Sequence, residues 1–219
     1  MHEKERGAEM KDRGLIILDS LSRDLRTLLT QPGILSDRYH AIDIAWRMAS
    51  DIAGARRLVA FGDVFVGDDP SPEQTAELAG MAKAATKQLR TTNWNVPGLF
   101  AELSEMLGVA VSEFQPLGKY PEAYEIETHL QDHMELASVA EFLTSEGFDV
   151  SKQADALGGI NADCIKTINW WNKTNEESLE SWRTWWGIAP EDKGPATFIL
   201  DLQRSYTRWG IAYPPYWAK

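Results

Sequence analysis

Apolar residues recur along most of the chain at steps of three and four, the spacing that places them on one side of an α-helix. Polar residues fill the positions between them, so each predicted helix has one face for the core and one for solvent. The predicted helices lie over or within residues 18–28, 37–53, 74–89, 99–107, 121–146, 161–168, 176–186 and 199–209. We therefore expect an all-α fold, a multi-helix bundle of about eight to ten helices.

The residues at the ends of these segments predict where the helices begin and stop. The run Ser71-Pro72-Glu73-Gln74 has serine at the cap, proline in the first turn and glutamine placed to close a capping box. Ser36 or Asp37 is predicted to cap the preceding helix, and Gly108 to stop its helix in the left-handed conformation. Residues 58–66 are β-branched and aromatic enough for a strand but are interrupted by glycine, so they predict a helix end followed by a loop.

The two halves of the chain share several residues at corresponding positions. The matching positions are Gln74, Leu78, Gly80 and Met81 with Gln153, Leu157, Gly159 and Ile160, residues 90–94 with 166–170, and residues 108–110 with 187–189. This similarity predicts two tandem related helical units, residues 1–115 and residues 116–219. Short amphipathic helices converge on such patterns, so one continuous domain stays the alternative.

Charge and composition narrow the function. Acidic residues exceed basic ones by 33 to 22, for a net charge of −11. Direct nucleic-acid binding draws on Lys and Arg, so this balance disfavours it and favours a basic protein partner, although solubility alone would also explain the excess. Apolar runs fall far short of the ~20 residues that span a membrane, and the N-terminus lacks the apolar segment of a secretory signal. The single cysteine, Cys164, excludes an internal disulfide framework, so we expect a cytoplasmic protein.

Three residues of the long predicted helix could bind a metal ion. Glu125, His129 and His133 follow one another at steps of four, so they lie on successive turns of one face. Two imidazoles and a carboxylate are a ligand set that suits a catalytic transition metal. This predicts a metal-dependent hydrolase, against the alternative that both histidines border the apolar face and bond to backbone or carboxylate groups. Motifs for an organic cofactor are missing, since the chain has neither a phosphate loop nor a dinucleotide fingerprint.

Residues 151–169 approximate the spacing of a helix-turn-helix, with Gly158-Gly159 as the turn. Its recognition helix would cover residues 161–169, which carry Asp163 and one basic residue, Lys166. Base reading needs Arg, Lys, Asn or Gln on a basic footing, and this segment supplies little of it. A DNA-binding regulator is therefore an alternative reading, and an ordinary helix pair joined by the two glycines is the simpler one.

Tryptophan is concentrated in the second half of the chain. Seven of the nine tryptophans follow residue 169, including the adjacent pairs Trp170-Trp171 and Trp185-Trp186. Successive residues of a helix point about 100° apart, so one member of each pair should reach a surface. Exposed tryptophan is typical of an interface anchor, although a large aromatic core is the alternative. The predicted partner-binding residues are Trp170, Trp171, Trp185, Trp186 and Trp217.

These patterns favour a non-catalytic, acidic, helical protein-binding module. We expect an inhibitor, immunity or adaptor type of protein that acts on a basic or nucleic-acid-processing protein. The metal-dependent hydrolase at Glu125, His129 and His133 and the helix-turn-helix regulator at residues 151–169 are the two alternatives. Association into a homo-oligomer stays open.

Overall fold

The computed structural model describes residues 13–61, 70–118 and 123–160. In chain order the elements are α2 (Arg13–Thr30), the 3₁₀ helix η1 (Pro32–Ser36), α3 (Arg38–Phe61), α4 (Pro72–Thr91), α5 (Leu99–Glu113) and α6 (Ala123–Ser145). Residues 151–160 are also helical. Every regular element within the described ranges is a helix, which confirms the all-α prediction for this part of the chain. None of these helices is long and apolar enough to pass through a bilayer.

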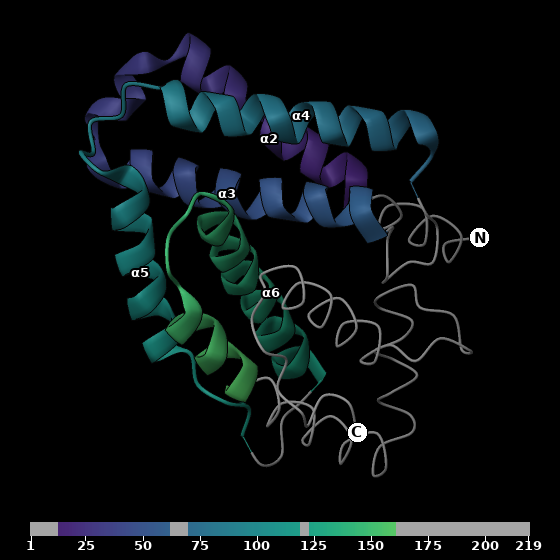
Figure 1. Ribbon diagram of the computed structural model, residues 1–219, viewed down its shortest axis with the longest axis vertical. Helices are drawn as coiled ribbons and strands as arrows, with labels where there is room; N and C mark the ends of the chain where they lie inside the picture. The colour runs from purple at the N-terminus through teal and green to yellow at the C-terminus, as the bar shows by residue number, and fades with distance from the viewer. Residues whose placement is uncertain (1–12, 62–69, 119–122, 161–219) are drawn as a thin grey trace.

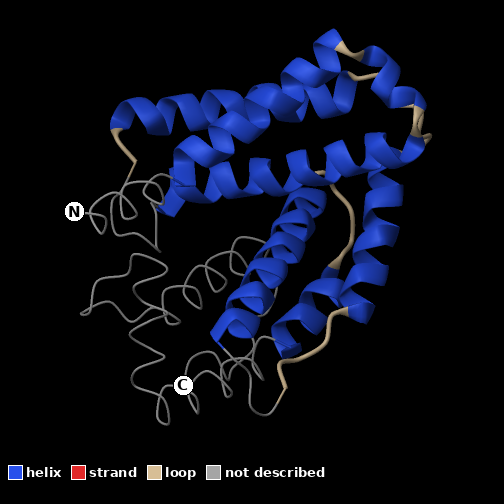
Figure 2. Cartoon of the chain, turned by 180° about the vertical axis from the view of Figure 1, so that it is seen from behind, coloured by secondary structure: helices blue, strands red, loops and turns tan. Residues whose placement is uncertain are grey.

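The helices form two groups that meet at α3 (Figure 1). Helices α2, α3 and α4 run across the molecule, and each of them packs against the other two. Helices α5 and α6 and residues 151–160 run away from this three-helix group at a steep angle, which the view from behind also shows (Figure 2). Helix α6 also packs against α3. Helix α3 therefore contacts members of both groups.

Several predicted helix ends are confirmed. Ser71 caps α4, its hydroxyl accepting from the Gln74 N–H at 3.2 Å, while the Gln74 side chain accepts from the Ser71 N–H at 2.9 Å. Asp37 caps α3, because its carboxylate accepts from the Tyr39 N–H at 2.9 Å. Helix α3 is described as far as Phe61, and the loop predicted after it lies outside the described residues. At the end of α6, Gly147 adopts a φ of +89°, which the absence of a Cβ atom permits.

Two predicted stops are wrong. Gly108 lies inside α5, which continues to Glu113, and its backbone is not left-handed. The glycine costs about 1 kcal/mol in a helix interior, but continuing the helix buries Val111 one turn after Leu107. Gly158-Gly159 does not form the predicted turn either, because residues 151–160 remain helical. At Gly108 the local signal for a stop was outweighed by Val111, which packs in the core because the helix goes on.

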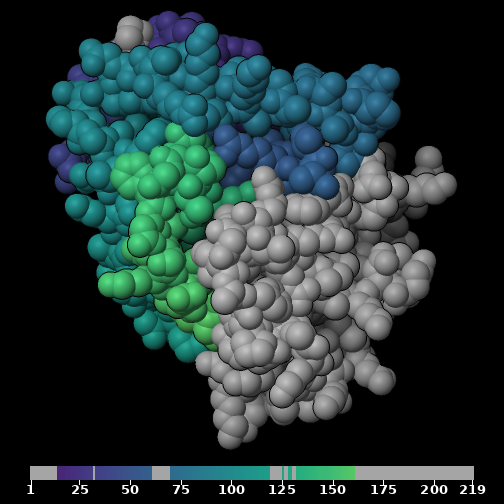
Figure 3. Space-filling view, viewed as in Figure 1, coloured from purple at the N-terminus to yellow at the C-terminus, as the bar shows by residue number. Residues whose placement is uncertain are grey.

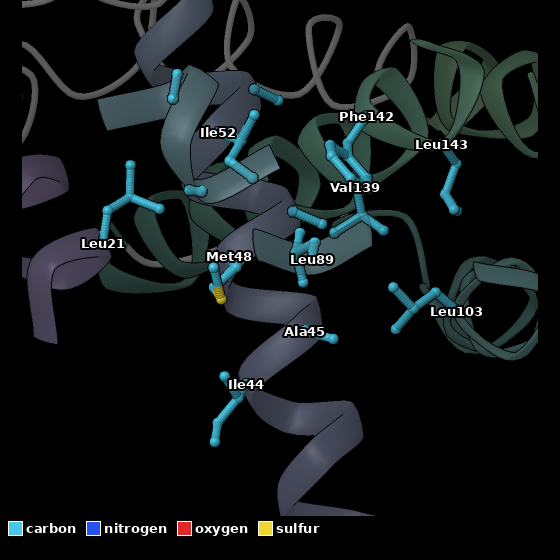
Figure 4. Packing of buried hydrophobic residues seen from close by; sticks show 14 of the residues in the cluster. Leu21, Ile44, Ala45, Met48, Ile52, Leu89, Leu103, Val139, Phe142 and Leu143 are labelled. Atoms are coloured by element: carbon cyan, nitrogen blue, oxygen red, sulfur yellow. The ribbon is translucent and has the colours of Figure 1, made fainter. Parts of the chain in front are cut away.

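One hydrophobic core joins the described helices and extends across residue 115. Side chains from α2, α3, α4, α5 and α6 belong to the same buried cluster (Figure 4). Its centre is the second half of α6, where residues 136–143 are buried on every side of the helix. Phe142 and Val139 point from α6 toward Ile52 and Leu89 (Figure 4). A helix that is enclosed all round must be covered by neighbours on all its faces, so α6 is the packing axis of this part of the molecule.

Candidate functional site

A concave surface lies between α3 and α4 and carries a concentration of positive charge. It has a volume of about 670 Å³, and its lining includes Arg56 from α3 and Lys83, Lys87 and Arg90 from α4. We call these four residues, with the apolar floor of Val59, Ala79 and Ala82, the cationic groove. Figure 3 shows α3 set back beneath α4, where this groove lies. Four of nine described lining residues are basic, against 22 of 219 in the whole chain, so the groove reverses the prevailing charge of the protein.

Arg56 is held in place by two hydroxyl groups. Its Nη2 donates to Thr86 Oγ1 at 3.0 Å, and its Nη1 donates to Ser145 Oγ at 2.8 Å. Each hydroxyl in turn donates to a carbonyl of its own helix, so its lone pairs face the guanidinium. The guanidinium also lies 5.9 Å from the ring centre of Phe142. These contacts from α4 and α6 orient the Arg56 guanidinium.

The three basic residues on α4 differ in how they are bound. Arg90 makes a two-pronged ion pair with Glu146, with N–O distances of 2.6 and 2.7 Å. Lys83 and Lys87 are exposed, and neither ammonium has a partner among the residues that the structure describes. Steps of four and three place these residues on one side of the helix. The groove therefore combines fixed arginines with two lysine charges that remain available.

The first half of α6 presents a second charged surface, of opposite sign. Glu125, Asp132 and Glu135 are all exposed and follow one another at steps of seven and three, which places them on one stripe of the helix. We call these three residues the acidic stripe. Glu135 also accepts a hydrogen bond from the Trp46 indole N–H at 2.6 Å. That bond explains why Trp46 is only half-buried: its ring packs on the core and its polar edge reaches α6.

The two histidines of the predicted metal site are buried beside the acidic stripe. His129 stacks on Phe114 with ring centres 4.5 Å apart. His133 Nε2–H donates to the carbonyl of Leu157 at 2.9 Å, which fixes the tautomer of the neutral ring. Burial lowers the pKa of each histidine to about 4, because the cationic form loses its hydration.

Glu125 belongs to the exposed stripe, whereas the two histidines face the protein interior. Among the described residues, no group of three or more His, Cys, Asp or Glu side chains is placed to hold a metal ion. The contacts of the histidines follow the structural alternative raised from the sequence: both border the core, and one is bonded to backbone.

Two further polar clusters lie inside the helix packing. Between α3 and α6, Arg57 donates to Glu141 at 2.9 Å and to Ser138 at 2.5 Å, and all three side chains are buried. Between α2 and α3, Arg47 donates to the buried Asp24 at 3.1 Å. Asp51 lies close by, and burial raises the pKa of its carboxyl to about 6, with the charge of Asp24 adding to the rise. Both clusters join neighbouring helices; the Arg57 cluster is buried, whereas Arg47 is partly exposed.

The sequence analysis missed the cationic groove, although part of its signal was present. Lys83, Lys87 and Arg90 already lie at steps of four and three within a helix that was predicted correctly. Arg56 could not be assigned to the same surface, because only the packing of α3 against α4 brings it there. The predicted tryptophan anchors and the predicted recognition helix, Trp170, Trp171, Trp185, Trp186, Trp217 and residues 161–169, lie outside the described residues.

The described part of the molecule is thus a helical scaffold with two exposed charged surfaces of opposite sign. The cluster of Arg57, Glu141 and Ser138, by contrast, is enclosed between α3 and α6. Comparison with protein-family models, with curated proteins and with solved structures finds no match for this chain.

Proposed function

We propose that this chain is a non-catalytic helical binding protein of inhibitor, immunity or adaptor type, which docks onto a basic protein partner. The observation that carries the proposal is the acidic stripe, Glu125, Asp132 and Glu135, exposed along α6 in a chain with a net charge of −11. Carboxylates gathered on one surface steer a basic partner during encounter and fix its orientation in the complex. The C-terminal tryptophans would supply the apolar anchors of the same interface.

The absence of catalysis in this proposal is supported by what the buried groups do. His133, one of the two histidines that a hydrolase would use, donates its Nε2–H to the Leu157 carbonyl. The buried pair Arg57 and Glu141 is turned into the α3–α6 packing. A general base or nucleophile needs a reactive atom that a substrate can reach, and these groups face the core.

The finer architecture belongs to the same proposal. We infer a bundle of about eight to ten helices in two tandem related units, residues 1–115 and 116–219. The matched positions Leu78 and Leu157 are both fully buried, as corresponding core positions of related units would be. A single cysteine, Cys164, suits a cytoplasmic home.

The test is affinity capture from extracts of the source cell with four forms of the full chain. These are the wild type, Asp132→Lys, the double variant Trp171→Ala/Trp185→Ala, and a control, Glu105→Lys. Asp132 is chosen because Glu135 also holds Trp46, so replacing Glu135 would disturb packing as well as charge. Glu105 is an exposed acid on α5, so the control changes net charge equally at another surface.

We expect a basic protein that is enriched by the wild type and by Glu105→Lys, and is recovered several-fold less by Asp132→Lys and by the tryptophan variant. The loss in Asp132→Lys should shrink as salt rises toward about 0.3 M, because screening removes the electrostatic contribution. The proposal is wrong if all four forms recover the same proteins in the same amounts.

A further inference from the structure

The cationic groove has a charge that the fold does not use. Arg90 is neutralised by Glu146, but the ammonium groups of Lys83 and Lys87 have no partner within the described residues. The two lysines lie one helical turn apart, about 6 Å along the α4 axis. Two like charges at this spacing repel each other by about 0.2–0.5 kcal/mol. Folding alone gives no reason to place both of them at the rim of a hollow.

The dipole of α4 does not explain the lysines either. Basic residues stabilise the C-terminal end of a helix only within its last turn. Arg90 is the basic residue in the last turn of α4. Lys83 and Lys87 lie further back, beside the groove floor of Val59, Ala79 and Ala82. Their common position over a concave, partly apolar surface points to a ligand.

We propose that the cationic groove binds a small phosphate-bearing molecule with an apolar or aromatic body. Lys83 and Lys87 contact the phosphate oxygens, since lysine is a common point-charge partner of phosphate in proteins. Arg56, oriented by Thr86 and Ser145, borders the same hollow and adds to its positive potential. The body of the ligand lies on the floor, where the short side chains of Ala79 and Ala82 let it approach the helix backbone. This site is separate from the acidic stripe and does not depend on the proposed protein partner.

Size and charge favour a small ligand over a nucleic acid or an acidic protein. A volume of about 670 Å³ lies within the usual range of small-molecule sites. A compact anion in the groove interacts mainly with the nearby lysines, because salt screens charges beyond about 8–10 Å. A long polyanion extends past the groove over a protein with a net charge of −11 and is repelled there.

The experiment is calorimetric titration of the full chain with adenosine diphosphate, inorganic pyrophosphate, adenosine and isophthalate, without divalent metal. We expect adenosine diphosphate to bind best, pyrophosphate more weakly, and adenosine and the dicarboxylate isophthalate at least tenfold more weakly than the diphosphate. Lys83→Ala/Lys87→Ala should weaken diphosphate binding about tenfold or more. Ala79→Phe, which fills the floor but keeps both lysines, should weaken adenosine diphosphate but not pyrophosphate.

The matched control is Lys152→Ala, an exposed lysine on the helix of residues 151–160 that does not line the groove. It should bind all four probes as the wild type does. Equal affinity of wild type and the double lysine variant for adenosine diphosphate would overturn the proposal. So would tighter binding of isophthalate. A short oligonucleotide and a glutamate-rich peptide are titrated in the same way, and tighter binding of either would also overturn the proposal, because it would assign the groove to another class of ligand.

Discussion

Charged side chains occur in two different settings in this molecule. Those between α6 and its neighbours are buried and paired, whereas the two lysines of the cationic groove are exposed and unpaired within the described residues. At α6, Arg57 and Glu141 are buried, and His133 donates to a backbone carbonyl. In the groove, Lys83 and Lys87 are exposed and have no partner among the described residues. One region binds its charges to each other, and the other holds two like charges side by side.

This difference separates residues that serve the fold from residues that are available for binding. A buried charge is tolerated only when it is paired, so its removal disturbs the fold. An exposed charge on a helix contributes little to stability, so its position is free to be set by a ligand. Measuring stability across both regions therefore tests the assignment of each group, and the expected effects fall in a definite order.

The largest effect is expected from breaking the buried pair. Glu141→Ala leaves the Arg57 guanidinium buried beside Ser138 without its carboxylate, which should lower the free energy of unfolding by about 3–5 kcal/mol. Urea denaturation at pH 7 measures this loss. The double variant Arg57→Met/Glu141→Leu should recover most of it, because apolar residues of similar volume replace both charges. A loss below about 1 kcal/mol in Glu141→Ala would mean that Arg57 reaches water. It would contradict the assignment of Arg57 and Glu141 to the residues that hold the fold together.

The second effect is a loss of stability in acid caused by the buried histidines. Their pKa is about 4 in the folded protein, against 6.5 for a free imidazole, so the unfolded chain binds more protons between these values. The stability is fully present above pH 6.5 and is lost as pH falls toward 4. Each pKa unit corresponds to 1.36 kcal/mol, so His133 accounts for about 3 kcal/mol over this window.

The check is urea denaturation from pH 7.5 to pH 4 of the wild type and His133→Gln. Glutamine keeps an N–H near the Leu157 carbonyl but does not titrate, so the variant should be less steeply destabilised by acid. Ala84→Gln, at an exposed position of α4 that carries no titratable group, is the control and should follow the wild type. An unchanged slope in His133→Gln would show that His133 does not carry the acid sensitivity.

The third effect has the opposite sign and comes from Asp51. Its pKa is raised to about 6, so the folded protein favours the protonated carboxyl. The associated stability is fully present below the ordinary pKa of 3.8 and is lost as pH rises through 6. Asp51→Asn removes this penalty while keeping an oxygen that can accept from Ser20. We expect the variant to be more stable than wild type by about 1–2 kcal/mol at pH 7, with no gain at pH 3.5 in thermal unfolding. Equal stability at pH 7 would contradict the raised pKa.

Local chemistry decided which parts of the fold the sequence could predict. The capping box of Ser71 and Gln74 closes within four residues, so it depends only on local sequence and could be predicted from it. Gly108 carried an equally local signal, but Val111 lies beyond it and packs in the core only if the helix continues. The stop prediction failed because a tertiary contact outweighed the preference of one glycine.

The candidate site divides in the same way. The stripe Lys83, Lys87 and Arg90 follows from helical spacing and was accessible from the sequence. The pairing of Arg57 with Glu141 joins residues 84 positions apart, and no spacing rule connects them. The burial of His129 and His133 also depends on which neighbours cover α6, which a single sequence does not specify. Their spacing of four is compatible both with a metal site and with two histidines that border the hydrophobic core.

The smallest effect on stability is expected where the effect on binding is largest. Lys83→Ala/Lys87→Ala removes two exposed charges that repel each other and introduces the best helix former at both positions. The free energy of unfolding should therefore stay within about 0.5 kcal/mol of the wild-type value or rise slightly, while diphosphate binding weakens about tenfold. Urea denaturation and calorimetry on the same preparation give both numbers.

A stability loss above about 1 kcal/mol would show that the lysines hold the fold together. The pair would then belong with Arg57 and Glu141, and their position over the hollow would no longer call for a ligand.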